Sequence, residues 1–253
     1  VNVCSRSCLH EARRDGLLDW RGSVINGDAR ALSAIPDSSI DLVVTSPPYY
    51  RTFSDEQDGE DSANIDIEAW TELIAETLDE LYRVTKPDAK VCIVVGTAKT
   101  SSDDRTRQFD LSAHTYTHAI EAGFDFVDQI VWQKPTYGEG GGERPLFGSY
   151  PYPPNLLVVQ NRELIQFFQK HVSEEDIHRR IRPEPGSERR EASKLRKDEW
   201  KEWTQSIWEI EPGRFFKYRD SFPRGIPHRL IRMYSFVGDT VLDPFLRSGT
   251  TAV

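Results

Sequence analysis

The apolar residues of this chain follow two spacings, one typical of buried strands and one typical of helices. Short apolar and β-branched runs predict strands at residues 22–28, 41–44, 91–96, 124–132, 155–159, 164–168, 203–210 and 240–242. Apolar residues near helical spacing predict helices at residues 9–20, 29–35, 65–84, 113–122 and 229–234. We therefore expect an α/β fold with an open sheet, which binds its ligands at the carboxyl ends of its strands.

The expected strand at residues 41–44 runs directly into Thr45-Ser46-Pro47-Pro48-Tyr49. The two prolines remove two backbone donors and fix φ, so the strand ends here in a rigid, extended corner. This corner presents the Ser46 hydroxyl, backbone carbonyl groups and the ring of Tyr49. It can accept hydrogen bonds from a planar amino group and stack on the ring that carries it. The alternative interpretation is an ordinary proline-rich turn with a surface tyrosine.

A second motif follows the apolar strand at residues 240–242, namely Asp243-Pro244-Phe245 and then Ser248-Gly249-Thr250-Thr251. Together the two motifs resemble those of the DNA amino-methyltransferases, in the order, catalytic motif first and cofactor motif last, of their β group. The resemblance runs from about Gly22 to the C-terminus. It implies a doubly wound Rossmann-like methyltransferase sheet with an inserted target-recognition region, S-adenosylmethionine as cofactor and double-stranded DNA as substrate.

The resemblance also implies which residues hold the cofactor. Asp243 can accept a hydrogen bond from the cofactor's ammonium group, and the small residues after it let the backbone approach the ligand. Asp28 ends an expected strand and either contacts the adenine or caps the helix expected after it. The expected cofactor residues are Asp28, Phe222, Pro223, Asp243, Pro244, Phe245, Ser248, Gly249, Thr250 and Thr251.

Two features depart from the family pattern. Arg247 stands where the family usually has glycine, and a long side chain there could crowd the cofactor. The sequence stops at Val253, before the strand that normally supplies an acidic residue for the cofactor's ribose. We therefore expect further residues, a homodimer or a second chain to complete the fold.

The expected reaction transfers a methyl group to an exocyclic amino nitrogen. Ser46 Oγ and the Pro47 carbonyl are the expected acceptors for the amino group, Pro48 stiffens the corner, and Tyr49 stacks on a flipped-out base. Within the resemblance, serine at the first motif position goes with cytosine N4, so we favour cytosine over adenine N6. A methyltransferase-like DNA-binding module without turnover is the alternative of another class.

Charge points to one local DNA-binding segment. The chain has a net charge of −9, so affinity for phosphate must come from local basic patches. Between residues 178 and 197, eight basic side chains face three acidic ones, although a solvated charged segment is the alternative. The family keeps a Trp-x-Lys-Pro segment near the target base and a recognition region after it. The expected DNA-binding residues are therefore Trp132, Lys134, Arg179, Arg180, Arg182, Arg189, Arg190, Lys194, Arg196 and Lys197. Core packing is the alternative role for Trp132, because tryptophan buries well while keeping one donor.

Composition argues against several other classes of protein. No run of about 18 apolar residues predicts a membrane span, and no secretory signal is visible, so we expect a cytoplasmic enzyme. Cys4, Cys8 and His10 lack a fourth ligand at a usual spacing, so we expect no metal site. We expect residues 1–21 to form an N-terminal extension. Residues 22–135 and 203–253 form the two parts of the catalytic core, and residues 136–202 form the target-recognition region.

Overall fold

The computed structural model describes residues 2–3, 24–48, 67–102, 105–134, 151–154, 158, 161–171, 186–211, 222–246 and 249–252. Their centre is a seven-stranded sheet in the order β1-β9-β2-β3-β7-β6-β8. These strands are β1 (Asn2–Val3), β2 (Ile40–Thr45), β3 (Thr85–Val95), β6 (Phe124–Gln133), β7 (Arg162–Lys170), β8 (Ile207–Glu209) and β9 (Val241–Asp243).

All strands of this sheet except β7 run in the same direction. The pairs β1–β9, β2–β9, β2–β3 and β6–β8 are parallel, whereas β7 is antiparallel to both β3 and β6. The parallel strands therefore end at one edge of the sheet, which we term the carboxyl edge. Ligands of open α/β sheets bind at such an edge.

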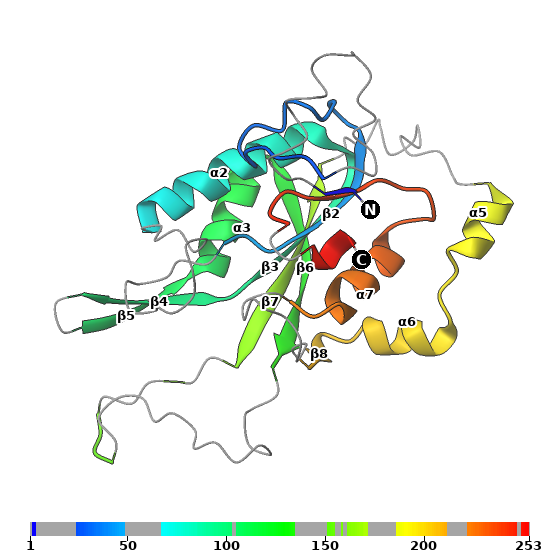
Figure 1. Ribbon diagram of the computed structural model, residues 1–253. Helices are drawn as coiled ribbons and strands as arrows, with labels where there is room; N and C mark the ends of the chain where they lie inside the picture. Colours follow the sequence, from blue (N-terminus) through cyan, green and yellow to red (C-terminus); the bar gives the residue numbers. More distant parts are fainter. Residues whose placement is uncertain are drawn as a thin grey trace.

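Helices cover both faces of the sheet (Figure 1). Helices α2 (Ile67–Val84) and α3 (Leu111–Glu121) pack with Val43 and Ile93 in one apolar cluster. Helix α7 (Gly225–Tyr234) packs with Val44 and Cys92 in a second cluster. Because successive side chains of a strand point to opposite faces, the two clusters lie on the two faces of the sheet. This is the doubly wound arrangement that the resemblance implied.

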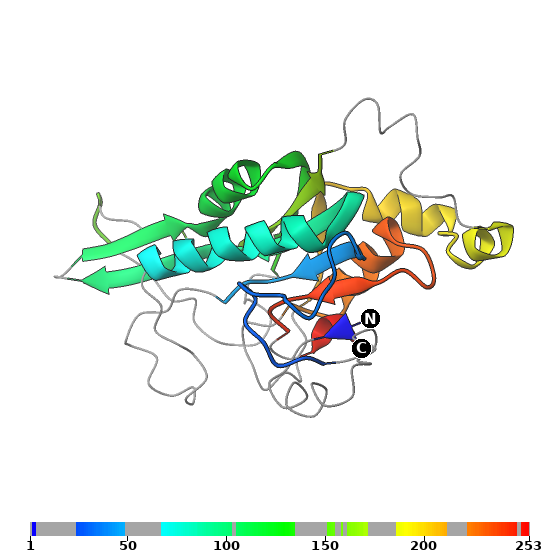
Figure 2. The same cartoon turned by 90° about the horizontal axis from the view of Figure 1, so that it is seen from above.

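The remaining elements lie around the sheet. A hairpin of β4 (Thr97–Ser102) and β5 (Arg105–Asp110) continues from the carboxyl end of β3. Helices α5 (Ser187–Ala192) and α6 (Lys197–Trp203) precede β8, and a 3₁₀ turn, η1 (Thr250–Ala252), follows β9. The hairpin and α5 lie on opposite sides of the molecule in both views (Figures 1 and 2).

The sequence located most of the core elements but not all. The strands expected at 41–44, 91–96, 124–132, 164–168 and 240–242 and the helices expected at 65–84, 113–122 and 229–234 correspond to observed elements. The β4–β5 hairpin was not predicted. The helix expected at 9–20 and nearly all of the strand expected at 155–159 fall outside the described residues.

Four expectations differ from the structure in extent or kind. Residues 29–35 form turns rather than a helix, because the Asp28 carboxylate binds the backbone N–H of Arg30 at 3.0 Å and Pro36 follows the segment. Of residues 24–28 only Val24 makes a bridge, and the strand expected at 203–210 is reduced to β8. Within residues 1–21, taken as an extension, Asn2 and Val3 pair with Leu242 and Asp243 at the sheet edge.

Candidate active site

The Ser46-Pro47-Pro48 corner lies at the carboxyl end of β2, as the sequence predicted. Pro47 is buried, and Ser46 and Pro48 are half-buried. The corner continues a strand whose six residues are all buried, so its backbone position is set by the core. Tyr49 lies outside the described residues.

Trp70, at the start of α2, fixes the corner from one side. Its indole Nε1 donates to the Pro48 carbonyl at 2.6 Å, and the side chain is fully buried. Its ring also meets that of His114, in the first turn of α3, edge to face at 6.5 Å. The sequence pattern marked Trp70 only as an apolar helix position. The signal that could have found this role is the single indole donor, which needs a partner when it is buried.

Asp243 fixes the corner from the other side. Its Oδ1 accepts a hydrogen bond from Thr45 Oγ1 at 2.6 Å and from the Phe245 backbone N–H at 3.1 Å. Its Oδ2 accepts from Thr251 Oγ1 at 2.7 Å. Burial raises the pKa of the Asp243 carboxyl, and these hydrogen bonds oppose that rise. The first residue of the cofactor motif is thus bonded to the residue that precedes Ser46.

The rest of the expected cofactor motif forms a turn beside Asp243. Pro244 and Phe245 are half-buried, and the side chains of Thr250 and Thr251 are buried. Gly249 has a φ of +75°, and among the described residues beyond its chain neighbours no atom lies within 4 Å of where a Cβ would stand, so they leave the backbone open to a ligand here. Ser248 and Arg247, whose bulk we expected to crowd the cofactor, fall outside the described residues.

The three remaining expected cofactor residues, Phe222, Pro223 and Asp28, lie in two different environments. Phe222 and Pro223 are buried at the start of α7, at the carboxyl edge, where the Pro223 carbonyl accepts from the Ile226 N–H at 3.0 Å. Asp28 is exposed and forms a salt bridge with Arg30 at 2.7 Å. Since no helix follows Asp28, its role as a helix cap is wrong, and the adenine contact stays a prediction.

Trp132 lies in the core rather than on a DNA-binding surface. Its side chain is 2% exposed, and its indole Nε1 donates to the Ile210 carbonyl at 2.9 Å. Direct contact of this side chain with DNA would require it to leave the core, which corrects the expectation from the sequence. Lys134, two residues later, remains accessible, with its side chain 35% exposed.

The basic segment is described from residue 186 onward, and the acidic residues that directly follow it nearly balance its charge. Six basic side chains face five acidic ones between residues 186 and 203. Arg189 binds the Asp239 carboxylate at 2.6 Å and also the Val237 carbonyl, which anchors α5 to the turn before β9. Arg196 pairs with Asp198 and Glu199, and Lys194 with Glu191. Arg189 therefore anchors α5, and its contact with DNA stays a prediction.

The described part of this segment also lies away from the corner. Helix α6 lies antiparallel to α7. Glu202 forms a salt bridge with Arg229 at 2.5 Å, and Glu199 pairs with Arg232 at 3.7 Å. Because α7 ends at the amino side of β9, α5 lies at the edge opposite the carboxyl edge (Figure 2). Arg190, Lys194, Arg196 and Lys197 thus lie on the side of the sheet opposite the corner, and their contact with DNA stays a prediction. Arg179, Arg180 and Arg182 lie outside the described residues.

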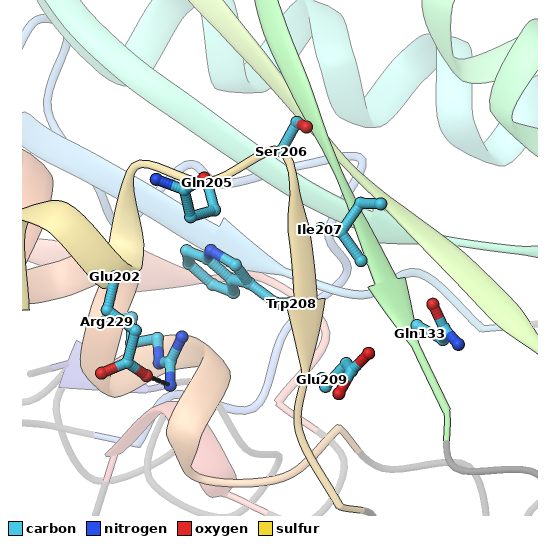
Figure 3. Close-up of a pocket in the computed structure, with 8 residues that line it drawn as sticks. All are labelled: Gln133, Glu202, Gln205, Ser206, Ile207, Trp208, Glu209 and Arg229. Carbon is cyan, nitrogen blue, oxygen red and sulfur yellow. Dashed lines mark hydrogen bonds and ion pairs between the residues drawn. The ribbon is translucent and has the colours of Figure 1, made fainter.

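A cavity of about 480 Å³ lies beside edge strand β8, between it and α6 and α7 (Figure 3). It is lined by Gln133, Glu202, Gln205, Ser206, Ile207, Trp208, Glu209 and Arg229. Strand β8 is four strand spacings from β2, or about 20 Å. This cavity is therefore separate from the corner and the cofactor turn.

Metal and membrane features are absent from the described part of the chain. No group of three or more His, Cys, Asp or Glu side chains there could hold a metal ion. Cys92 is buried in β3, and Cys4, Cys8 and His10 lie outside the described residues. None of the described helices is both long and apolar enough to cross a membrane.

Comparison with known proteins identifies relatives along nearly the whole chain. A family model described as DNA methylase, covering N6 and N4 methyltransferases, matches residues 40–253. The type II methyltransferase M.MjaI of Methanocaldococcus jannaschii is 33% identical over 90% of this chain and 81% of its own length. The type II methyltransferase M.MthZI of Methanothermobacter thermautotrophicus is 28% identical over 88% of this chain and 66% of its own length.

Solved structures show the same architecture. TTHA0409 of Thermus thermophilus, which is described as a putative DNA modification methylase and was crystallised with S-adenosyl-L-methionine, superposes with a TM-score of 0.66. It is 31% identical and covers 89% of this chain and 80% of its own. The cytosine-N4-specific PvuII DNA methyltransferase superposes with a TM-score of 0.57 over 92% of this chain and 77% of its own; at 18% identity it supports the fold alone.

Proposed function

This chain belongs to the N6/N4 DNA methylase family and is a DNA methyltransferase, and on that premise we propose that it methylates the exocyclic N4 of cytosine in DNA. The proposal includes S-adenosylmethionine as methyl donor, the cofactor of this methyltransferase family. The observation that carries it is the hydrogen bond between Thr45 and Asp243, which holds the catalytic corner beside the cofactor turn. A methyl donor and an acceptor base can therefore meet at one place on the carboxyl edge.

The residues of the cofactor turn suit a zwitterionic ligand. We propose that Asp243, Pro244, Phe245, Ser248, Gly249, Thr250 and Thr251, with Phe222, Pro223 and Asp28, hold the donor. The open space at Gly249 admits a ligand to the backbone. Oδ2 of Asp243 accepts one hydrogen bond from Thr251, so a second lone pair is available to an ammonium group.

Once bound, S-adenosylmethionine supplies an electrophilic methyl carbon: a nitrogen–carbon bond forms, the carbon–sulfur bond breaks, and the extra proton leaves the nitrogen for solvent. The corner makes the exocyclic amino nitrogen of the base a better nucleophile. Ser46 Oγ and the Pro47 carbonyl accept hydrogen bonds from the amino group, which favours its pyramidal form and frees its lone pair. Preorganised groups placed where charge develops contribute about 3 kcal/mol each. Tyr49 stacks on the base after it leaves the duplex.

Serine at position 46 favours cytosine within this family resemblance, and the type II relatives favour a role in a restriction–modification system. We further propose that DNA approaches the carboxyl edge, where the corner lies. The proposed recognition region, residues 136–202, includes β7, which belongs to the central sheet. The part before β7 leaves and rejoins the sheet at the carboxyl edge, because the Lys134 N–H donates to the Asn161 carbonyl at 2.7 Å. Among the described residues expected to contact DNA, Lys134 lies at this edge, and we propose that it contacts the DNA.

The test is transfer of labelled methyl from S-adenosylmethionine to unmethylated genomic DNA, followed by nucleoside digestion and mass analysis. N4-methylcytosine is the expected product, and sequencing of the modified DNA gives the recognition site. N6-methyladenine would retain the reaction and overturn the choice of base. No product, with no cofactor binding by calorimetry, would favour the binding-module alternative over turnover.

One variant and a matched control test whether the corner takes part in the reaction. Ser46→Ala is expected to lower the turnover number with little change in DNA affinity, because it removes one acceptor for the amino group. Ser206→Ala, at an exposed serine before β8, is the matched control and should retain full activity. Unchanged turnover in Ser46→Ala would remove Ser46 from the mechanism.

A further inference from the structure

Two side chains of helix α2 fasten the turns that precede β2. The Arg83 guanidinium donates to the Leu32 carbonyl at 3.0 Å, to the Ile35 carbonyl at 3.1 Å and to the Asp37 carboxylate at 2.5 Å. The Glu80 carboxylate accepts from the Leu32 N–H at 2.7 Å. Side chains of α2 therefore bind backbone groups that a helix at these turns would have paired internally.

Glu80 and Arg83 also hold each other in place. Arg83 Nε and Nη2 each donate to the Glu80 carboxylate at 2.8 Å, so the two side chains form a bidentate pair. Hydrogen bonding from Arg83 lowers the pKa of the Glu80 carboxyl, against the opposing effect of burial. Leu32 and Ile35, beside the pair, are buried in the core. The pair is therefore a fixed and ionised clamp on the turns.

A further contact reaches Asp28, which belongs to the proposed cofactor site. Asp28 Oδ2 accepts from the Arg30 guanidinium at 2.7 Å, and Oδ1 accepts from the Arg30 backbone N–H at 3.0 Å. Arg30 Nη1 in turn lies 3.5 Å from the Glu76 carboxylate of α2. Glu76, Glu80 and Arg83 follow one another at spacings of four and three residues, so they share one face of the helix. The same face of α2 thus supports the end of the segment that carries Asp28.

Helix α2 also places this segment relative to the catalytic corner. The helix starts at the carboxyl edge, where Trp70 donates to the Pro48 carbonyl at 2.6 Å, and it leads into β3 at the opposite edge. The segment runs along α2 from Glu76 toward Arg83, so Asp28 lies at its end nearest the carboxyl edge. Trp70 and Glu76 are about 9 Å apart along the helix axis. One helix therefore supports both the corner and the segment that carries Asp28.

We propose that Glu80 and Arg83 are positioning residues for S-adenosylmethionine, because they fix the backbone of the segment that presents Asp28 to the adenine. Arg30, held by Glu76, orients the Asp28 carboxylate for the same contact. The inference rests on the proposed function, since it takes Asp28 as the acceptor for the adenine amino group. None of the three supporting contacts involves the reacting atoms. Their loss should therefore weaken cofactor binding and leave the chemical step unchanged.

The first experiment measures, by calorimetry, the binding of S-adenosylhomocysteine and of its deaminated analogue, in which a carbonyl replaces the adenine amino group. Arg83→Lys and Arg30→Met should raise the Kd of S-adenosylhomocysteine roughly 3- to 10-fold, the effect of a group that must be ordered on binding. Neither should weaken binding of the analogue, which offers Asp28 no amino group. Lys201→Met, at an exposed lysine of α6, is the control and should bind both ligands as the wild type does.

The outcomes separate this inference from the proposed function. A wild type that binds neither ligand overturns the proposed function, and one that binds both equally overturns the adenine contact of Asp28 and this inference with it. A wild type that prefers S-adenosylhomocysteine, with the same preference and affinity in Arg83→Lys and Arg30→Met, overturns only this inference. Equal weakening for both ligands would assign the clamp to general stability and also contradict it. Arg30 is half exposed, so Arg30→Met keeps the test valid if Arg83→Lys fails to fold.

The second experiment separates cofactor binding from the chemical step. Methyl transfer is measured against the concentration of S-adenosylmethionine at saturating DNA. Glu80→Gln should raise the KM for the cofactor roughly 3- to 10-fold and leave kcat unchanged, because the clamp does not reach the corner. Glu188→Gln, at an exposed glutamate of α5, is the matched control and should change neither constant. A fall in kcat with an unchanged KM in Glu80→Gln would contradict the positioning role.

Discussion

The hydroxyl of Thr45 donates to Oδ1 of Asp243 at 2.6 Å, and it thereby joins two residues that are 198 positions apart in the chain. Both side chains are buried, with 1% and 2% exposure. Thr45 precedes the catalytic corner, and Asp243 begins the cofactor motif. The contact forms because β2 and β9 are parallel neighbours that end at the same edge.

Thr45→Val should both destabilise the protein and slow methyl transfer. Valine has nearly the same shape but leaves a buried carboxylate oxygen without this donor, which costs about 1–3 kcal/mol. Thr45→Ser keeps the hydroxyl and is the control. Urea unfolding and kcat measure the two effects. A Thr45→Val protein as stable and active as Thr45→Ser would show that this contact does not couple the motifs.

Trp70→Phe should slow transfer without weakening cofactor binding. It removes the indole donor that holds the Pro48 carbonyl at 2.6 Å, so the corner gains freedom at the reacting centre. Displacement of reacting groups by about 1 Å can cost about 100-fold in rate. Single-turnover kinetics and calorimetry with S-adenosylmethionine test this. Trp200→Phe, at an exposed tryptophan of α6, is the control, and a loss of activity there equal to that of Trp70→Phe would contradict the assignment.

The free energy of unfolding should depend on pH through the Asp243 carboxyl. Burial raises the pKa of its carboxyl above the ordinary value of about 3.9. The folded state then binds this proton more tightly than the unfolded state does, so the contribution is complete below the unfolded pKa. It is lost as the pH rises through the folded pKa.

Asp243→Asn isolates that contribution, since asparagine does not titrate. The free energy of unfolding of wild type minus variant should fall as the pH rises from about 4 through the raised pKa. Urea unfolding at a series of pH values measures the difference. A difference that rises with pH over this range would mean that hydrogen bonds from Thr45, Thr251 and Phe245 outweigh burial.

Arg189→Met should destabilise the protein by about 1–2 kcal/mol and leave the salt dependence of DNA binding unchanged. The substitution removes the charged partner at Oδ1 of the buried Asp239 carboxylate, whose Oδ2 still accepts from the Phe236 N–H, and it removes no proposed phosphate contact. Lys197→Met, at an exposed residue, should not change stability. Thermal unfolding and the slope of log affinity against log salt are the readouts. A slope smaller by about one unit in Arg189→Met would restore it as a phosphate contact.

The sequence by itself determined the parts of this protein that depend on local physics. The buried run at residues 41–44 and the two prolines after it specify a strand that must end in a stiff corner, whatever surrounds it. The helical spacing of apolar residues likewise specified most of α2. The Asp243-Pro-Phe and Gly-Thr-Thr segments, together with the corner, were sufficient to indicate the family.

Tertiary structure alone decided which distant residues meet. Trp70 looked like an ordinary core position until α2 packed over the corner, and Trp132 looked like a base contact until β8 and Ile210 covered it. The charge of the basic segment was likewise evident in the sequence. Its position was not, because it depends on the packing of α6 along α7, away from the carboxyl edge. Side-chain type and spacing encode periodicity and backbone stiffness. They do not encode partners tens of residues away, which strand order and helix packing select.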